Sequence, residues 1–188
     1  TLKMSEVRIL SGPPYIYESM RVLFLSPYFF PHIGGVEKHA LEVAKKLAGR
    51  GFDVSVITQK TSFSEKEEAN IHGIKIYRIW PGRDDWFRKF RIWKALWKKR
   101  KLISKADLVH THDVFFWYLP FRIIYPLKRV FVTFHGFEGK FPVSKKAIMI
   151  RKISEELSFG NICVGDYIKK WYRTKPTYTT YGGIEISK

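Results

Sequence analysis

The stretch from Arg21 to Thr58 limits the possible fold more than any other part of the chain. It begins with RVLFLS, a short apolar run of the kind that forms a strand buried on both faces of a parallel sheet. After a loop with two adjacent glycines, apolar residues recur at spacings of three and four, which predicts a helix that Gly51 ends. Its apolar face consists of Val36, Ala40, Val43, Ala44 and Leu47. The β-rich run from Phe52 to Thr58 completes a strand–loop–helix–strand unit.

The glycine pair Gly34-Gly35 lies where this helix is expected to begin. Because glycine has no side chain, backbone N–H groups there can approach a ligand at a helix N-terminus, where the partial positive charge favours phosphate. A tight turn without a ligand explains the pair equally well, because the spacing is not the full G-x-G-x-x-G pattern. Both interpretations stay open at this point.

Composition sets the class of protein. A chain of 188 residues with 45% hydrophobic and 16% aromatic residues fits one globular α/β domain. The single cysteine, Cys163, excludes an intramolecular disulfide, and its apolar neighbours are typical of an inert core position. No apolar run reaches the ~20 residues of a membrane span and no signal peptide is apparent, so we expect a cytoplasmic protein. A formal net charge of +17 favours anionic partners: nucleic acid, anionic lipid or phosphorylated substrates.

A basic segment from Asp84 to Lys101 is predicted to form an amphipathic helix, with Asp84 and Asp85 at its N-terminus. Half of the residues from Trp86 to Lys101 are Lys or Arg, and none is acidic. Spacings of four, three and four place one aromatic stripe on the helix, formed by Trp86, Phe90, Trp93 and Trp97. The cations predicted on the opposite side are Arg88, Arg91, Lys98 and Lys99. This pattern predicts contact with an anionic membrane. The alternatives are packing of the tryptophans on the sheet and, less favoured, nucleic-acid binding.

Histidines follow two of the predicted strands. The strand from Ala106 to His112 ends in HTHD, residues 110–113, and the strand from Arg129 to Phe134 is followed by His135 and Gly136. Ligands of open α/β sheets bind at the carboxyl ends of the strands, so these histidines are expected to converge on one cleft. His110 and His112 share a strand face and would also suit a metal pair, but nothing nearby completes a tetrahedral set.

The remaining segments continue the alternation. We expect a surface loop over 59–70, a turn at His72-Gly73, a short helix interrupted near Pro120, and a helix that Ser144 caps. The later elements are a strand at 161–165, a helix at 166–173 and a strand at 177–181. About six strands interleaved with helices predict an α/β fold, with a doubly wound, mainly parallel sheet and helices on both faces.

Four motifs in this order, PYFFPHIGGVEKHALEVAKKLAGRGFDVSVIT, DLVHTHD, VFVTFHG and YGGIE, resemble the N-terminal domain of family 4 glycosyltransferases. The likeness covers about Met20 to Glu185. It implies one Rossmann-like half of a GT-B fold, in a retaining enzyme that moves a sugar from a nucleotide sugar to an acceptor. It also implies that no cofactor or obligatory metal takes part.

The resemblance implies roles for single residues. Gly34 and Gly35 match the glycine loop that faces the donor diphosphate and the acceptor, and His135 matches the histidine that reaches the transferred sugar. His112 and Asp113 match the loop on the acceptor side. At the end of the chain, YGGIE departs from the family's Asn-Gly-Val/Ile-Asp motif, but its position still suits a hinge.

The expected organisation is an N-terminal extension at 1–19, an acceptor-side domain at 20–181 and the start of an interdomain linker at 182–188. In the GT-B fold a second domain holds most of the nucleotide, so we expect the chain alone to be inactive. The acceptor is expected to be a sugar or a lipid-linked acceptor, such as a lipid-linked sugar or a phospholipid, and the cytoplasmic protein to be peripheral at the inner face of the membrane. The competing hypotheses are a non-catalytic basic module that binds polyanions and a self-contained nucleotide-binding protein. No specific nucleic-acid motif is recognisable.

Overall fold

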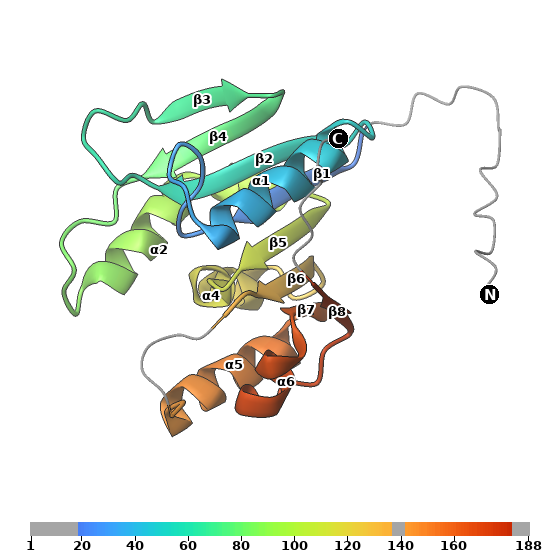
Figure 1. The fold of residues 1–188 in the computed structure, drawn as a ribbon. Helices are drawn as coiled ribbons and strands as arrows, with labels where there is room; N and C mark the ends of the chain where they lie inside the picture. The colour runs from blue at the N-terminus through green and yellow to red at the C-terminus, as the bar shows by residue number, and fades with distance from the viewer. Residues whose placement is uncertain (1–18, 137–141, 182–188) are drawn as a thin grey trace, which may run out of the picture.

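A single eight-stranded sheet organises the computed structural model, which describes residues 19–136 and 142–181. The strand order is β3-β4-β2-β1-β5-β6-β7-β8, visible in Figure 1 from β3 at the top to β8 at the bottom. The strands are β1 (Arg21–Leu25), β2 (Asp53–Gln59), β3 (Glu68–Ile71), β4 (Ile74–Ile79), β5 (Leu108–His112), β6 (Arg129–Phe134), β7 (Gly160–Val164) and β8 (Tyr178–Thr180). Neighbouring strands are parallel except for β3 and β4. The α/β, mainly parallel fold is therefore confirmed.

Helices cover the two faces of the sheet unequally. They are α1 (Gly35–Ala48), α2 (Arg88–Lys98), α3 (Arg100–Lys105), α4 (Phe115–Ile124), α5 (Lys145–Leu157) and α6 (Asp166–Tyr172). Alternate residues of β1 face opposite sides, as a strand requires: Leu23 and Leu25 join the core under α2–α6, and Val22 and Phe24 join the core under α1. Central strand β1 is thus buried on both faces, which explains its uninterrupted apolar run.

One predicted loop is partly wrong. Residues 68–71 form the edge strand β3, which pairs antiparallel with β4 through the turn at His72-Gly73. Both turn residues have positive φ, 53° and 80°, as a tight hairpin turn requires. The strand is short and only its alternate residues Ala69 and Ile71 pack against the core, so its sequence carries little periodic signal. The sheet therefore has more strands than the sequence predicted.

Helix α4 runs through Pro120 without interruption, contrary to the expectation from sequence. Proline has no N–H, so the carbonyl of Phe116, four residues earlier, has no helical donor. The indole N–H of Trp93 on α2 donates to that carbonyl at 3.0 Å, and the Trp93 ring lies against the Phe116 ring. Trp93 therefore compensates for the proline and joins α2 to α4.

The basic segment is helical, but α2 begins at Arg88 and a separate short helix, α3, follows it. The carboxylate of Asp85 accepts the backbone N–H of Phe87 at 2.8 Å, so an acidic residue does lie at the helix start. The face that packs on the core is formed by Ile92 and Leu96 rather than by the tryptophans. No helix in the described ranges is long and apolar enough to span a membrane. Ser144 caps α5 as expected, because its hydroxyl accepts the N–H of Ala147.

Candidate functional site

The predicted histidines meet at the carboxyl edge of the sheet, because β5 pairs with β6 and His112 lies opposite Thr133. Nδ1 of His112 lies 3.0 Å from Nε2 of His135, and the two rings are stacked with centroids 5.2 Å apart. His110 also stacks on His112, at 4.6 Å between centroids. The convergence expected from the strand ends is therefore observed.

A fourth histidine, which the sequence reasoning missed, completes the cluster. His39 on α1 meets the ring of His135 edge to face, with centroids 5.0 Å apart. It follows Gly35 by four residues, so it lies about one turn along the same face of the helix. This four-residue spacing is the feature of the sequence that could have predicted His39 as part of the site. The helix N-terminus and the strand-end histidines therefore belong to one site.

These imidazoles are neutral at ordinary pH. Burial, reinforced by the neighbouring ring of His39, lowers the pKa of His110 to about 4. Burial also lowers the pKa of His135 to about 3, with smaller contributions from nearby imidazoles and Arg151. The pKa of His112 lies well below its usual range, because that ring is fully buried. The cluster therefore offers hydrogen-bonding nitrogens rather than positive charge.

The backbone of His135 is held from several sides. Its N–H donates to the Asp113 carboxylate at 3.0 Å, and its carbonyl accepts the Tyr167 hydroxyl at 2.5 Å. The adjacent carbonyl of Gly136 accepts from Arg151, which is 2% exposed and stacks on Tyr172 at 3.7 Å. Asp113 adopts a left-handed backbone, φ 58°, that turns the chain after β5. Asp113 thus supports His135. His112 has no exposed surface, so it can act on a ligand only through His135.

The two glycines differ in their surroundings. Gly34 is the N-cap of α1, and a Cβ atom there would collide with the carboxylate of Glu37, whose other oxygen pairs with Nδ1 of His32 at 3.2 Å. A Cβ atom on Gly35 would meet no atom within 4 Å. Gly34 therefore accommodates Glu37, whereas Gly35 leaves the helix N-terminus open to an approaching group.

The described residues contain no group of three or more His, Cys, Asp or Glu side chains that could hold a metal ion. Two hollows, of about 420 and 350 Å³, open at the carboxyl edge and share Lys89 and Phe116 in their linings. The second hollow also touches Asp113, directly below the histidine loop. Space for a ligand therefore exists beside the site.

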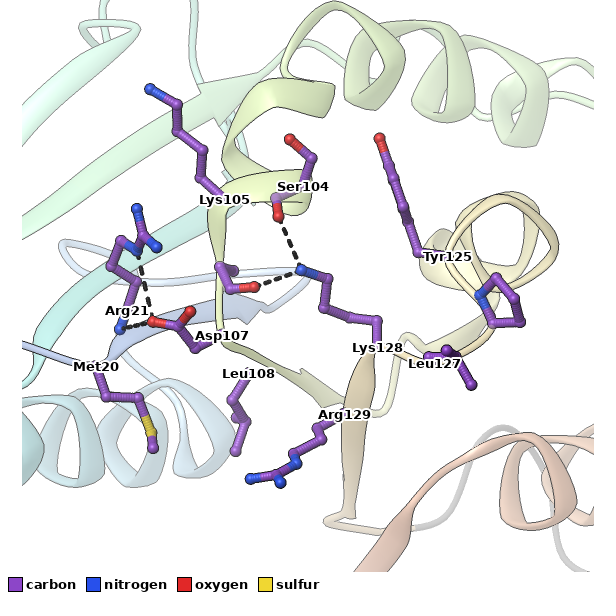
Figure 2. A pocket seen from close by; sticks show the side chains of 12 residues that line it. Met20, Arg21, Ser104, Lys105, Asp107, Leu108, Tyr125, Leu127, Lys128 and Arg129 are labelled. Carbon is purple, nitrogen blue, oxygen red and sulfur yellow. Dashed lines mark hydrogen bonds and ion pairs between the residues drawn. The ribbon is translucent and has the colours of Figure 1, made fainter.

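A larger hollow of about 660 Å³ lies at the opposite edge of the sheet, at the amino ends of β1, β5 and β6 (Figure 2). Two of the cations that line it are engaged within the fold: Lys128 donates to the carbonyls of Ser104 and Ala106, at 2.8 and 2.5 Å, and the Arg21 side chain pairs with Asp107. The length of the strands separates this hollow from the histidines. It therefore adds nothing to their chemistry.

Comparisons with known proteins agree with this geometry. The sequence profile of Glycosyltransferase Family 4 matches residues 33–188, and a search of curated proteins gave no match. Sucrose-phosphate synthase from Thermosynechococcus elongatus has a similar structure, with a TM-score of 0.68 at 15% identity over 88% of this chain and 48% of its own. An α-glucosyltransferase solved with UDP and a 13-mer DNA containing an HMU base has a TM-score of 0.52 at 16% identity, over 86% and 42%. UGT73P12 from Glycyrrhiza uralensis, complexed with glycyrrhetinic acid 3-O-monoglucuronide, has a TM-score of 0.52 at 13% identity, over 87% and 49%. At these identities the likeness shows a shared fold, and the chain spans just under half the length of each protein.

Proposed function

The chain belongs to glycosyltransferase family 4, and we propose that it is the acceptor-side half of a retaining enzyme that uses a nucleotide-sugar donor. The observation that carries this proposal is the meeting of His135, His39 and the open N-terminus of α1 at one edge of the sheet. A helix N-terminus favours the diphosphate of a donor, and a neutral imidazole can hydrogen-bond a sugar hydroxyl. The α-glucosyltransferase of the same fold, solved with UDP, supports a nucleotide-linked donor.

The mechanism we propose is attack on the same face from which the diphosphate departs. The acceptor oxygen bonds to the anomeric carbon as the bond from that carbon to the diphosphate breaks, and the departing phosphate oxygen takes the acceptor proton. The carboxylates that flank the site do not suit a nucleophile, because Asp113 accepts the N–H of His135 and Glu37 pairs with His32. His135 then acts as a hydrogen-bond donor that stabilises the negative charge on the departing diphosphate. It does not attack the anomeric carbon.

The proposal is tested by producing the protein together with the sequence encoded downstream of Lys188 and assaying it for sugar transfer. We expect a second, nucleotide-holding domain there, and an enzyme that transfers sugar from one of a panel of nucleotide sugars with its anomeric configuration kept. Proton NMR of the product measures that configuration. The competing hypothesis of a polyanion-binding module predicts no transfer and steeply salt-dependent binding of nucleic acid.

Replacing Gly35 with alanine is expected to weaken donor binding by the two-domain enzyme about tenfold without unfolding the domain. The added methyl group meets no protein atom, but it fills the space through which the diphosphate reaches the N–H groups of α1. Calorimetry with the nucleotide sugar measures the binding, and the melting temperature measures the fold. Gly49→Ala at the other end of α1 is the matched control, because Gly49 has ordinary helical φ. Equal donor affinity in both variants would remove Gly35 from the donor site.

We further propose that α2 contacts an anionic membrane, through a smaller set of residues than the sequence suggested. Trp86, Phe90 and Trp97 are 73%, 47% and 48% exposed. Trp93 packs against Phe116 and donates to its carbonyl. Three of the four predicted cations have ion-pair partners. These pairs are Arg88 with Asp84, Arg91 with Asp85 and Lys99 with Glu68. The proposed membrane surface is therefore the three exposed aromatic residues together with the exposed Lys94 and Lys98.

Replacing both Lys94 and Lys98 with alanine is expected to weaken binding to vesicles containing anionic lipid roughly thirtyfold, because each lysine near such a surface contributes ~1 kcal/mol. Co-sedimentation measures the binding. Trp86→Ser should also reduce it, whereas Leu127→Ser is the matched control, since Leu127 is 95% exposed near the opposite edge of the sheet. Unchanged binding in both the lysine double variant and Trp86→Ser would assign α2 to packing alone.

A further inference from the structure

One buried nitrogen in the histidine cluster has an unusual environment. Nε2 of His112 is fully buried and has no hydrogen-bond partner among the residues that the structure describes. The other nitrogen of the same ring, Nδ1, lies 3.0 Å from Nε2 of His135. The ring packs against Phe24 and His110, whose ring centroids lie 4.9 and 4.6 Å away. Its position is therefore fixed, and the location of its single proton is what remains to be determined.

Two neutral arrangements fit the short contact. In the first, His135 donates from Nε2, which forces the proton of His112 onto its own Nε2, as a buried N–H without a partner. In the second, His112 donates from Nδ1, and its Nε2 is left as a bare acceptor. Buried N–H groups without a partner are rarer than buried acceptors without one. An N–H group donates one hydrogen bond, so burial without a partner removes the only hydrogen bond that it made with water. The second arrangement is therefore favoured.

We infer that His112 is a positioning residue whose Nδ1–H donates to Nε2 of His135, so that His135 carries its own proton on Nδ1. His135 then presents a hydrogen-bond donor on the nitrogen that His112 does not occupy. The low pKa of both rings keeps a second proton off this pair, so the tautomer persists at ordinary pH. The clamps on the backbone of His135, from Asp113 and Tyr167, hold the ring at the distance the bond requires.

The value of this arrangement rests on the proposed function. A donor group that is already oriented in the resting protein needs no reorganisation when negative charge develops on the departing diphosphate. A histidine free to exchange tautomers would present a bare acceptor part of the time. His112 therefore raises the fraction of His135 that is ready to donate, without touching the substrate.

The first experiment reads the tautomer directly and does not depend on activity. The 188-residue chain is labelled with ¹⁵N-histidine, and long-range ¹H–¹⁵N correlations at pH 7 distinguish protonated from bare ring nitrogens. His135→Asn and His112→Asn assign the signals by removing one ring each. We expect both His112 and His135 to be protonated on Nδ1. A His135 ring protonated on Nε2, or averaged between the two forms, overturns the inference.

The second experiment separates positioning from packing. His112→Phe keeps a flat ring against Phe24 and His110 but removes the donor, whereas His112→Asn places an amide N–H close to the position of Nδ1. In the two-domain enzyme we expect His112→Phe to lower kcat about tenfold with the donor KM unchanged, and His112→Asn to recover most of the loss. Equal kcat for the wild type and His112→Phe refutes the role. If the two-domain protein shows the expected tautomer but transfers no sugar, the proposed function is refuted and the tautomer assignment still stands.

Discussion

Replacing His135 with alanine is expected to lower kcat of the two-domain enzyme about 10²–10³-fold while leaving the donor KM nearly unchanged. His135 is half-buried, whereas the neighbouring His112 is fully buried, so a bound sugar can meet the ring of His135. Its loss removes a donor that strengthens as charge develops in the transition state, which affects kcat rather than ground-state binding. Steady-state kinetics with donor and acceptor varied separately measure both constants.

Matched variants sharpen this expectation. His135→Asn should retain more activity than His135→Gln, because the amide nitrogen of asparagine lies nearer the position of Nδ1. His72→Asn, in the exposed hairpin turn, controls for the loss of a histidine far from the site. With a pKa of about 3, His135 stays neutral throughout the range from about pH 5 to 9. If kcat of the wild type changes with pH in that range and this change is absent from the His135 variants, His135 titrates there. That result would contradict its role as a neutral donor.

The meeting of His112 and His135 could be predicted because it depends only on topology. Both residues follow parallel strands, and parallel neighbours deliver their carboxyl ends to one edge. His39 could not be placed in the same way, since its distance from His135 depends on how α1 crosses β1 and β5. The orientation of Asp113 was equally hidden, because it follows from a left-handed turn that Asp tolerates but does not require.

The basic helix shows a second limit of periodicity. Spacing predicts one aromatic stripe along this helix, but it cannot say which neighbouring stripe meets the core. Ile92 and Leu96 make that contact, and the reason Trp93 turns inward lies in another element, where Pro120 leaves a carbonyl without a donor. The ion pairs of Arg91 with Asp85 and of Lys99 with Glu68 likewise depend on tertiary contacts that a helical pattern does not contain.

The 188-residue chain alone is expected to transfer sugar at least about 10⁵-fold more slowly than the two-domain enzyme. In the proposed enzyme the histidine cluster and the N-terminus of α1 orient a sugar and attract a diphosphate, but a second domain holds most of the nucleotide against them. Holding donor and acceptor together can supply ~7–11 kcal/mol of the barrier, and a one-sided site forfeits that contribution. Transfer of labelled sugar, measured for both proteins at equal concentration, gives the ratio.

A folding control decides how this result is interpreted. Circular dichroism and a cooperative melting curve must show that the isolated chain is folded, since an unfolded chain would be inactive for a different reason. The sheet and its two cores lie within the described residues, which predicts that the domain folds without its partner. Activity within about a hundredfold of the two-domain enzyme would contradict the proposal, because one wall of the site would then suffice to hold the donor in a reactive geometry.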